Sequence, residues 1–242
     1  MQDDTTPPGR LRVLDPGEPL VVELGAAEPV NPPTGPEDLD RRVAADRRVL
    51  VLEVDRRPAV VLWVALTVGI PDRLDEVLSP AAAVIDPATA DTAVFHSIWN
   101  VDAALAGRGA ATLLVDLALD HLVRTMPQVT TATTMSPVPG LRDWLAGRGT
   151  TEAPEDGTLT HLAAEYLCAR REDGAVLDPV ARFHLGNGAR LWRILPDADR
   201  SPRGLERAFG VMANYRYAPE DRTANRAQVS AGVTPVGPEV PT

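Results

Sequence analysis

Two apolar runs dominate the first half of the chain. Residues 49–54 and 59–66 are β-branched or aliphatic almost throughout, and the polar segment 55–58 separates them. Apolar runs joined by a short polar turn are typical of a β-hairpin. Residues 11–13 and 20–24 predict two further short strands.

The middle of the chain combines a strand, a small-residue turn, a helix and a second strand. Residues 93–99 and 128–135 are strand-like, and residues 106–112 are small and glycine-containing. The helix between them carries Leu113, Leu114, Leu117 and Leu122 on one face. This layout leaves backbone N–H groups bare at a helix N-terminus, where they can hold an anion. We therefore expect a phosphate-binding turn at residues 106–112.

The last third of the chain alternates short helices and strands. The pattern predicts helices over 141–146, 159–170 and 201–207, a hairpin of strands 180–185 and 189–195, and a last strand over 210–217. In the hairpin, His184 would face away from the apolar side chains. We expect one α/β domain over residues 10–217 with a mixed sheet flanked by helices, a disordered tail over 1–9 and a flexible tail over 218–242.

Composition excludes several classes of protein. The formal net charge of −10 argues against general nucleic-acid binding and against docking on anionic lipid. A single cysteine, Cys168, excludes an internal disulfide and fits a reducing cytoplasm. No signal peptide is evident, and the longest apolar run, 60–70, is too short to span a bilayer. We expect a soluble, cytoplasmic protein.

Every basic residue of the chain is an arginine. The lack of lysine excludes Schiff-base chemistry and pyridoxal aldimines. Side-chain contacts to a phosphate must therefore come from arginine, which suits bidentate binding. Arg108 is the first candidate, with Arg182 and Arg193 behind it, although solvation at the surface explains the last two equally well.

The turn at 106–112 fits two known phosphate motifs incompletely. Gly107 to Thr112 matches part of the dinucleotide fingerprint, but residues 128–132 supply no acid for a ribose, so we set a nicotinamide site aside. The pyrophosphate loop of GNAT acyltransferases, Gln/Arg-x-x-Gly-x-Gly/Ala, fits better, with Ala106, Gly109 and Ala111 at its marked positions. Taken alone, the glycines are explained slightly better by a simple strand-to-helix turn.

Other chemical signatures are weak. The four histidines show no metal-ligand spacing, and no Gly-x-Ser-x-Gly motif occurs. His96 is expected in the core, and His121 and His161 at the surface. His184 and Ser136 have structural explanations as well: an ordinary buried or turn histidine, and a serine that caps or turns the chain.

Several longer runs nevertheless carry a joint signal. They are Leu39-Asp40-Arg41-Arg42-Val43, Val64-Ala65-Leu66-Thr67, Ala93-Val94-Phe95-His96-Ser97-Ile98, Met135-Ser136-Pro137-Val138-Pro139-Gly140, Asp178 to Ala189 with Leu191-Trp192-Arg193, and Met212-Ala213-Asn214-Tyr215-Arg216-Tyr217. Together and in this order, over roughly residues 20–217, they resemble one family, the malonyl-CoA decarboxylases. The resemblance implies a GNAT-like α/β acyltransferase fold. Family members usually carry a helical domain ahead of the catalytic one, and the printed chain begins almost directly with the catalytic part.

The resemblance also implies roles for particular residues. The family's catalytic serine maps onto Ser136 and its catalytic histidine onto His184. Its coenzyme A loop maps onto Ala106, Gly107, Arg108, Gly109, Ala110, Ala111 and Thr112. Ala106 and Gly109 stand where the family has glutamine and glutamate. Asn214 and Tyr215 are expected to line the substrate pocket.

The implied activity is decarboxylation of malonyl-CoA, or a related malonyl thioester, to acetyl-CoA and carbon dioxide. No metal or cofactor is expected, because the thioester carbonyl is the electron sink. The expected partner is an acyl-CoA or an acyl carrier protein, with no nucleic acid or membrane and with a homo-oligomer as an option. Two alternatives stay open: a GNAT-type acyltransferase, and a coenzyme A-binding protein without turnover.

Overall fold

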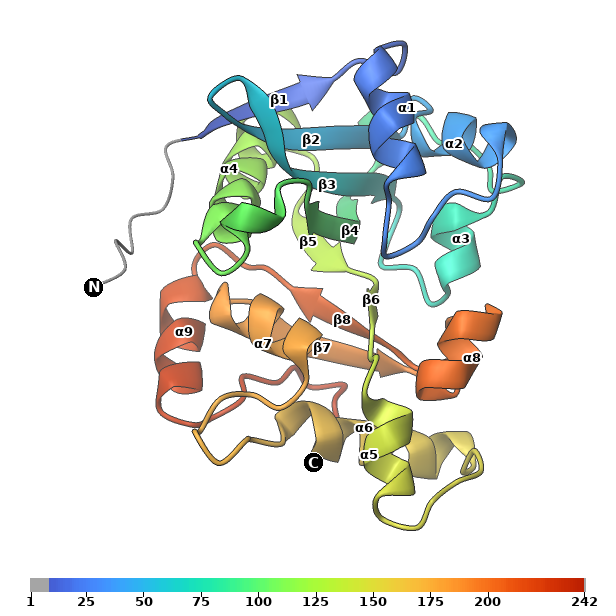
Figure 1. Cartoon of the computed structure of the whole chain (residues 1–242), viewed down its shortest axis with the longest axis vertical. Helices are drawn as coiled ribbons and strands as arrows, with labels where there is room; N and C mark the ends of the chain where they lie inside the picture. Colours follow the sequence, from blue (N-terminus) through green and yellow to red (C-terminus); the bar gives the residue numbers. More distant parts are fainter. Residues whose placement is uncertain (1–8, 242) are drawn as a thin grey trace. The chain divides into compact units, whose positions relative to one another are not determined.

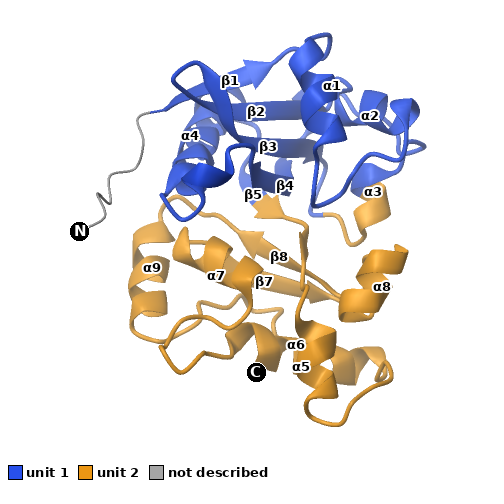
Figure 2. Ribbon diagram, in the orientation of Figure 1, with its two compact units in different colours: residues 1–70, 77–132 blue, residues 71–76, 133–242 orange. Residues whose placement is uncertain are grey.

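The computed structural model describes residues 9–241. The chain forms two compact units, shown in different colours in Figure 2. Unit 1 holds the residues up to 70 together with 77–132, and unit 2 holds 71–76 together with 133–242. The sequence had predicted one domain over 10–217.

Unit 1 is built on a five-stranded sheet in the order β1-β2-β3-β4-β5. The strands are β1 (Arg10–Leu14), β2 (Arg47–Val54), β3 (Arg57–Thr67), β4 (Thr92–Asn100) and β5 (Thr131–Thr134). Neighbours from β1 to β4 are antiparallel. The predicted hairpin is confirmed as β2 and β3, and the predicted strand, helix and strand in the middle of the chain are confirmed as β4, α4 (Ala110–Thr125) and β5.

Helices cover the sheet of unit 1 (Figure 1). Alternate side chains of β2 and β3, including Val49, Val51 and Trp63, form a core with α1 (Pro19–Ala26) and are packed by Leu39 of α2 (Pro36–Arg42). The intervening residues of both strands point to the opposite face, and α4 packs against β2 and β3. The short elements of unit 1 are η1 (Pro87–Thr89) and η2 (Ala103–Leu105), while α3 (Leu74–Leu78) begins in unit 2 and ends in unit 1.

The strand predicted over 20–24 was wrong, because these residues belong to α1. Pro19 occupies the first turn of the helix, where its missing N–H costs nothing. Val21 and Leu24, three positions apart, are the buried side chains. A short apolar run fits a strand and a buried helix equally well, and here the helical spacing decides.

Unit 2 contains a three-stranded antiparallel sheet in the order β6-β8-β7. The strands are β6 (Ser136–Pro137), β7 (Arg190–Leu195) and β8 (Met212–Arg216). Its helices are α5 (Leu141–Ala146), α6 (Asp156–Cys168), α7 (Pro179–Gly186), α8 (Pro202–Ala208) and α9 (Arg222–Ser230). The predicted helices over 141–146, 159–170 and 201–207 are confirmed as α5, α6 and α8, and the last strand as β8.

The strand predicted over 180–185 was wrong, because the segment is helix α7. Asp178 caps the helix by accepting the N–H groups of Val180 and Ala181, and Pro179 follows it in the first turn. Gly188, with φ of +85°, follows the helix in the left-handed conformation. These signals lie in the sequence, but the alternation of apolar residues in the run favoured a strand.

The two predicted tails are described to different extents. The N-terminal tail, 1–9, lies outside the described residues except for Gly9. The C-terminal segment, expected to be flexible, instead contains α9, a bridge between Val236 and Leu191, and Val240 at 5% exposure. Asn225, also buried, donates to the carbonyl of Gly188 at 3.0 Å. A buried polar contact of this kind orders a segment whose composition alone predicts a loop.

The turn between β2 and β3 allows a test of the fold. Asp55 and Arg56 have φ of 50° and 62°, so two residues with side chains occupy the left-handed region that a two-residue hairpin turn requires. Replacing Arg56 with glycine removes this strain, and we expect the free energy of unfolding to rise by about 1 kcal/mol. Urea denaturation measures the difference.

Arg57→Gly is the matched control for this prediction. Arg57 is equally exposed but belongs to β3 and is not left-handed. Glycine at position 57 increases the conformational entropy that the chain loses on folding and relieves no strain, so it should not stabilise the protein. A gain in stability for Arg57→Gly as large as that for Arg56→Gly would contradict the account.

Candidate active site

Ser136 and His184 meet in unit 2 although 48 positions separate them in the sequence. Ser136 Oγ lies 3.1 Å from His184 Nε2. The chain of polar groups continues on both sides: Ser136 Oγ lies 2.8 Å from Thr134 Oγ1, and His184 Nδ1 lies 2.8 Å from the Tyr217 hydroxyl. Four side chains thus form one continuous hydrogen-bonded chain, along which protons can be passed in either direction.

The surroundings keep the histidine uncharged. His184 is 5% exposed, and burial lowers its pKa to about 3. Its ring stacks on Tyr215 at 4.8 Å between centroids and meets Phe183 edge-on. A neutral imidazole has one donor and one acceptor nitrogen, and each faces a hydroxyl here. The site therefore offers a substrate neutral hydrogen-bonding groups and no cation from this histidine.

Helix α7 carries His184 and is itself held in place by contacts at both of its ends. Asp178 caps the N-terminus. At the C-terminus, the carbonyl of Asn187 accepts hydrogen bonds from Arg222 and Arg226 of α9. Arginine at this end also complements the negative pole of the helix. A helix of eight residues is marginal by itself, so these contacts fix where the imidazole lies.

Thr134 and Tyr217 are site residues that sequence reasoning missed. Thr134 Oγ1 also accepts the backbone N–H of Tyr215 at 3.0 Å, which holds β8 beside the serine. Tyr217 follows β8 and is 2% exposed. Its position within the run Asn214-Tyr215-Arg216-Tyr217 was the available signal, because alternate residues of a strand share a face.

Asn214 and Tyr215, predicted to line the substrate pocket, are both fully buried. The Asn214 amide donates to the carbonyl of Thr134 at 2.7 Å and accepts from Arg193 at 3.1 Å. Tyr215 supports the imidazole by stacking, and its hydroxyl has no hydrogen-bond partner among the described residues. The two residues support the Ser136–His184 pair from the interior of unit 2.

The turn predicted to bind phosphate lies in unit 1, ahead of α4. Gly107 and Gly109 are left-handed, with φ of 74° and 76°, and Gly109 is the N-cap residue directly before α4. The helix carries no side-chain cap and no acid in its first turn. The first helical bond runs from Leu113 N–H to Gly109, which leaves the N–H groups of Ala110, Ala111 and Thr112 without an intrahelical partner.

This geometry suits an anion. Three aligned N–H groups at the positive end of a sixteen-residue helix attract phosphate oxygens. Gly107 and Arg108 are exposed, and a side chain at Gly107 would meet nothing within 4 Å. Arg182 and Arg193 are engaged elsewhere, Arg182 with the carbonyl of Val176 and Arg193 with Asn214 and Asp72.

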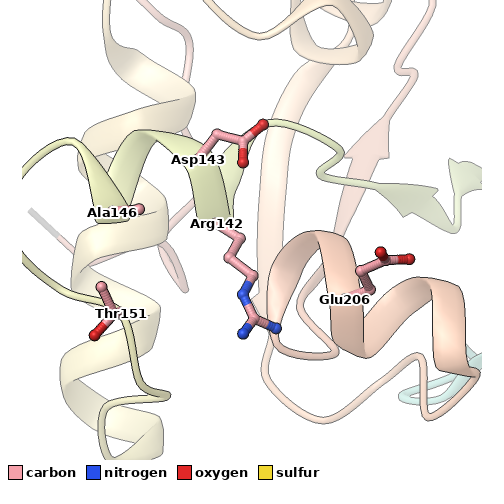
Figure 3. Close-up of a pocket in the computed structure, with 5 residues that line it drawn as sticks. All are labelled: Arg142, Asp143, Ala146, Thr151 and Glu206. Atoms are coloured by element: carbon pink, nitrogen blue, oxygen red, sulfur yellow. The ribbon is translucent and has the colours of Figure 1, made fainter.

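Other features of the described residues do not suggest a site. A hollow of about 520 Å³ in unit 2 is lined by Arg142, Asp143, Ala146, Thr151 and Glu206 (Figure 3). Arg142 lies over the ring of Phe209 and donates to the carbonyl of Leu205, so its guanidinium already has partners within the protein. Within residues 9–241, no three His, Cys, Asp or Glu side chains gather as metal ligands, and no helix is long and apolar enough to cross a membrane.

The mixed α/β architecture defines a class: a protein with a GNAT-like fold. The GNAT-like decarboxylase GphF superposes with a TM-score of 0.61 at 21% identity, over 86% of this chain and 98% of that one, which shows the shared fold. The sequence model of the malonyl-CoA decarboxylase C-terminal domain matches residues 21–157 and 150–236. The chain belongs to this family.

Individual relatives agree with this assignment. Mitochondrial malonyl-CoA decarboxylase of the goose Anser anser anser is 29% identical over 86% of this chain and 51% of its own length. The crystal structure of malonyl-CoA decarboxylase from Agrobacterium vitis superposes with a TM-score of 0.87 at 33% identity, over 96% of this chain and 66% of that one. The chain thus spans about half the length of the curated relatives it matches.

The low pKa of His184 makes a prediction about stability. The folded protein keeps this imidazole neutral down to about pH 3, whereas the unfolded chain takes up a proton near pH 6.5. The free energy of unfolding should therefore fall as pH drops below 6.5, with His184 contributing up to about 1.4 kcal/mol per pH unit. Urea denaturation at several pH values between 7.5 and 4 measures this slope.

His184→Gln is the control variant, because glutamine does not titrate. Its slope should be shallower than that of the wild type over the same range. His161, which is exposed, supplies a second comparison. If His184→Gln and His161→Gln have the same pH dependence, the neutral, buried state of His184 is refuted.

Proposed function

We propose that this protein decarboxylates malonyl-CoA or a related malonyl thioester, with Ser136 and His184 at the reacting group. Membership of the malonyl-CoA decarboxylase C-terminal domain family supports the reaction class. The observation that carries the proposal is the buried, neutral Ser136–His184 pair. Because the chain spans only part of its relatives, the activity, the substrate and the partners are proposals.

The electrostatics of the pair suit loss of carbon dioxide. A malonyl thioester carries a carboxylate whose charge moves onto the thioester carbonyl oxygen as the C–C bond breaks. A cation beside the carboxylate would stabilise the starting state and slow the reaction. Neutral O–H and N–H donors of side chains that are buried, as Ser136 and His184 are, hold the carboxylate without that penalty.

The same groups supply a proton afterwards. Departure of carbon dioxide leaves an enolate, whose carbon-2 must gain one proton to give the acetyl thioester. Ser136 and His184 belong to a chain that continues to Thr134 and Tyr217, so a proton delivered by one member is replaced from the next, and the one proton consumed in each turnover is taken up from water. A placed proton donor typically contributes about 10²–10⁴-fold in rate.

The turn at Ala106–Thr112 is proposed to take the coenzyme A pyrophosphate. GphF, with the same fold, was solved in complex with isobutyryl-CoA. The bare N–H groups at the start of α4 are the chemical basis of the proposal for this chain, with Arg108 beside them. We propose that the reaction needs no cofactor, because the thioester itself accepts the electron pair.

The first test is direct. Purified protein incubated with malonyl-CoA should release acetyl-CoA and carbon dioxide without an added acceptor. Ser136→Ala and His184→Ala should each lower kcat by at least about 10²-fold while the fold is kept, because each removes a link of the proton chain. Full activity in either variant would refute the site, and product formation only with an added amine or carrier protein would favour an acyltransferase.

Tyr217→Phe tests the far end of the chain. The substitution keeps the ring and removes only the hydroxyl that lies 2.8 Å from His184 Nδ1. We expect kcat to fall about tenfold with little change in KM, because substrate binding is untouched and the imidazole loses its partner. Phe183→Leu is the control, because it changes only the packing around the imidazole. Tyr166→Phe is not suitable, since the Tyr166 hydroxyl donates a hydrogen bond to Asp178.

A further inference from the structure

A second set of buried polar groups lies in unit 2, apart from the catalytic pair. Asp178 has no exposed surface. One of its oxygens accepts the N–H groups of Val180 and Ala181 at 2.9 and 2.8 Å, and the other accepts the hydroxyl of Tyr166 at 3.1 Å. The carboxylate therefore ties the start of α7 to α6. Nothing in the proposed chemistry uses Asp178 or Tyr166.

Tyr166 also contacts the segment that carries the serine. A Cβ placed on Gly140 would lie 2.3 Å from the Tyr166 hydroxyl oxygen and 3.3 Å from the carbon that bears it. Gly140 has φ of −101°, which any residue adopts, so space and not backbone conformation requires glycine here. The final glycine of the run Ser136 to Gly140 is therefore a packing requirement of Tyr166.

Tyr166 cannot move aside cheaply. It is 4% exposed, its ring lies 5.5 Å from that of Trp144, and its hydroxyl is bound to Asp178. Burial and the neighbouring carboxylate raise the pKa of Tyr166, so the phenol keeps its proton and donates it. The segment around Gly140 is fixed as well, since Val138, two residues before it, and Leu141, directly after it, are fully buried.

These contacts close a ring. Ser136 and Gly140 belong to one segment, Gly140 packs against Tyr166, Tyr166 binds Asp178, and Asp178 begins the helix that ends near His184. We propose that Gly140, Tyr166 and Asp178 form a positioning unit that sets the Ser136–His184 distance. These three residues touch neither substrate nor reacting atoms, and the proposal rests on the function proposed above for this site.

A double-mutant cycle tests the positioning unit. Gly140→Ala forces the serine segment and α6 apart, and we expect kcat for malonyl-CoA to fall roughly 10- to 100-fold with KM changed less than about threefold, since a misplacement near 1 Å costs about 10² in rate. Tyr166→Phe should lower kcat about threefold. The double variant Gly140→Ala/Tyr166→Phe lacks the oxygen that causes the clash, so its kcat should return to within about threefold of Tyr166→Phe.

Gly157→Ala is the matched control. Gly157 lies on α6, the same helix as Tyr166, and a Cβ there meets nothing within 4 Å. It should keep wild-type kcat, and circular dichroism and thermal denaturation should show that all variants fold. A purely structural role would lower stability without this pattern in kcat. Wild-type kcat in Gly140→Ala, or a double variant as slow as the product of the two single effects, would overturn the proposal.

The ¹⁵N signals of His184 give a readout that does not depend on turnover. The chain has four histidines, so His184 can be assigned by loss of its signals in His184→Gln. The signals should shift in Gly140→Ala and return in the double variant, while Gly157→Ala leaves them in place. Unchanged signals in Gly140→Ala would refute the positioning unit. If the wild type does not turn over malonyl-CoA, the proposed function fails, but this cycle still decides the geometry.

Discussion

The hydrogen bond between Ser136 and His184 depends on elements that are too short to hold themselves in place. Strand β6 has two residues and helix α7 has eight. Neither is stable in isolation, since nucleating a helix costs more than a few bonds return. The position of each side chain therefore comes from tertiary contacts: Thr134 beside the serine, Asp178 ahead of the helix, and the two arginines of α9 behind it.

Two buried histidines of the chain, His96 and His184, differ in their hydrogen-bond partners. His96 of β4 and His184 of α7 are both nearly inaccessible, and burial lowers the pKa of each. Neither ring nitrogen of His96 has a hydrogen-bond partner among the described residues, whereas both nitrogens of His184 face hydroxyls. Only the second arrangement gives a buried neutral imidazole a path for a proton. Connection, more than burial, separates the candidate catalytic group from a core residue.

Sequence reasoning reached the strands of unit 1 and most helices of unit 2, because their periodicity is strong. It failed at α7, where Ala181, Phe183 and Leu185 alternate as in a strand although the cap at Asp178 and Pro179 starts a helix. Ser136 and His184 were predicted to act together only because of the family resemblance; no local sequence pattern connects them. Tyr217, Tyr166 and Gly140 were missed, since their roles lie in distances between segments that no local pattern encodes.

One departure from the family in the turn at 106–112, Gly109 in place of glutamate, is consistent with binding through the backbone. Gly109 is left-handed and is the N-cap of α4, and a side chain there would be strained. A glutamate at this position would also place negative charge beside N–H groups that are proposed to hold a pyrophosphate. Glycine therefore favours the anion but provides no acid for the chemistry. In this chain, the proposed proton transfer must then rest on the neutral chain of Thr134, Ser136, His184 and Tyr217.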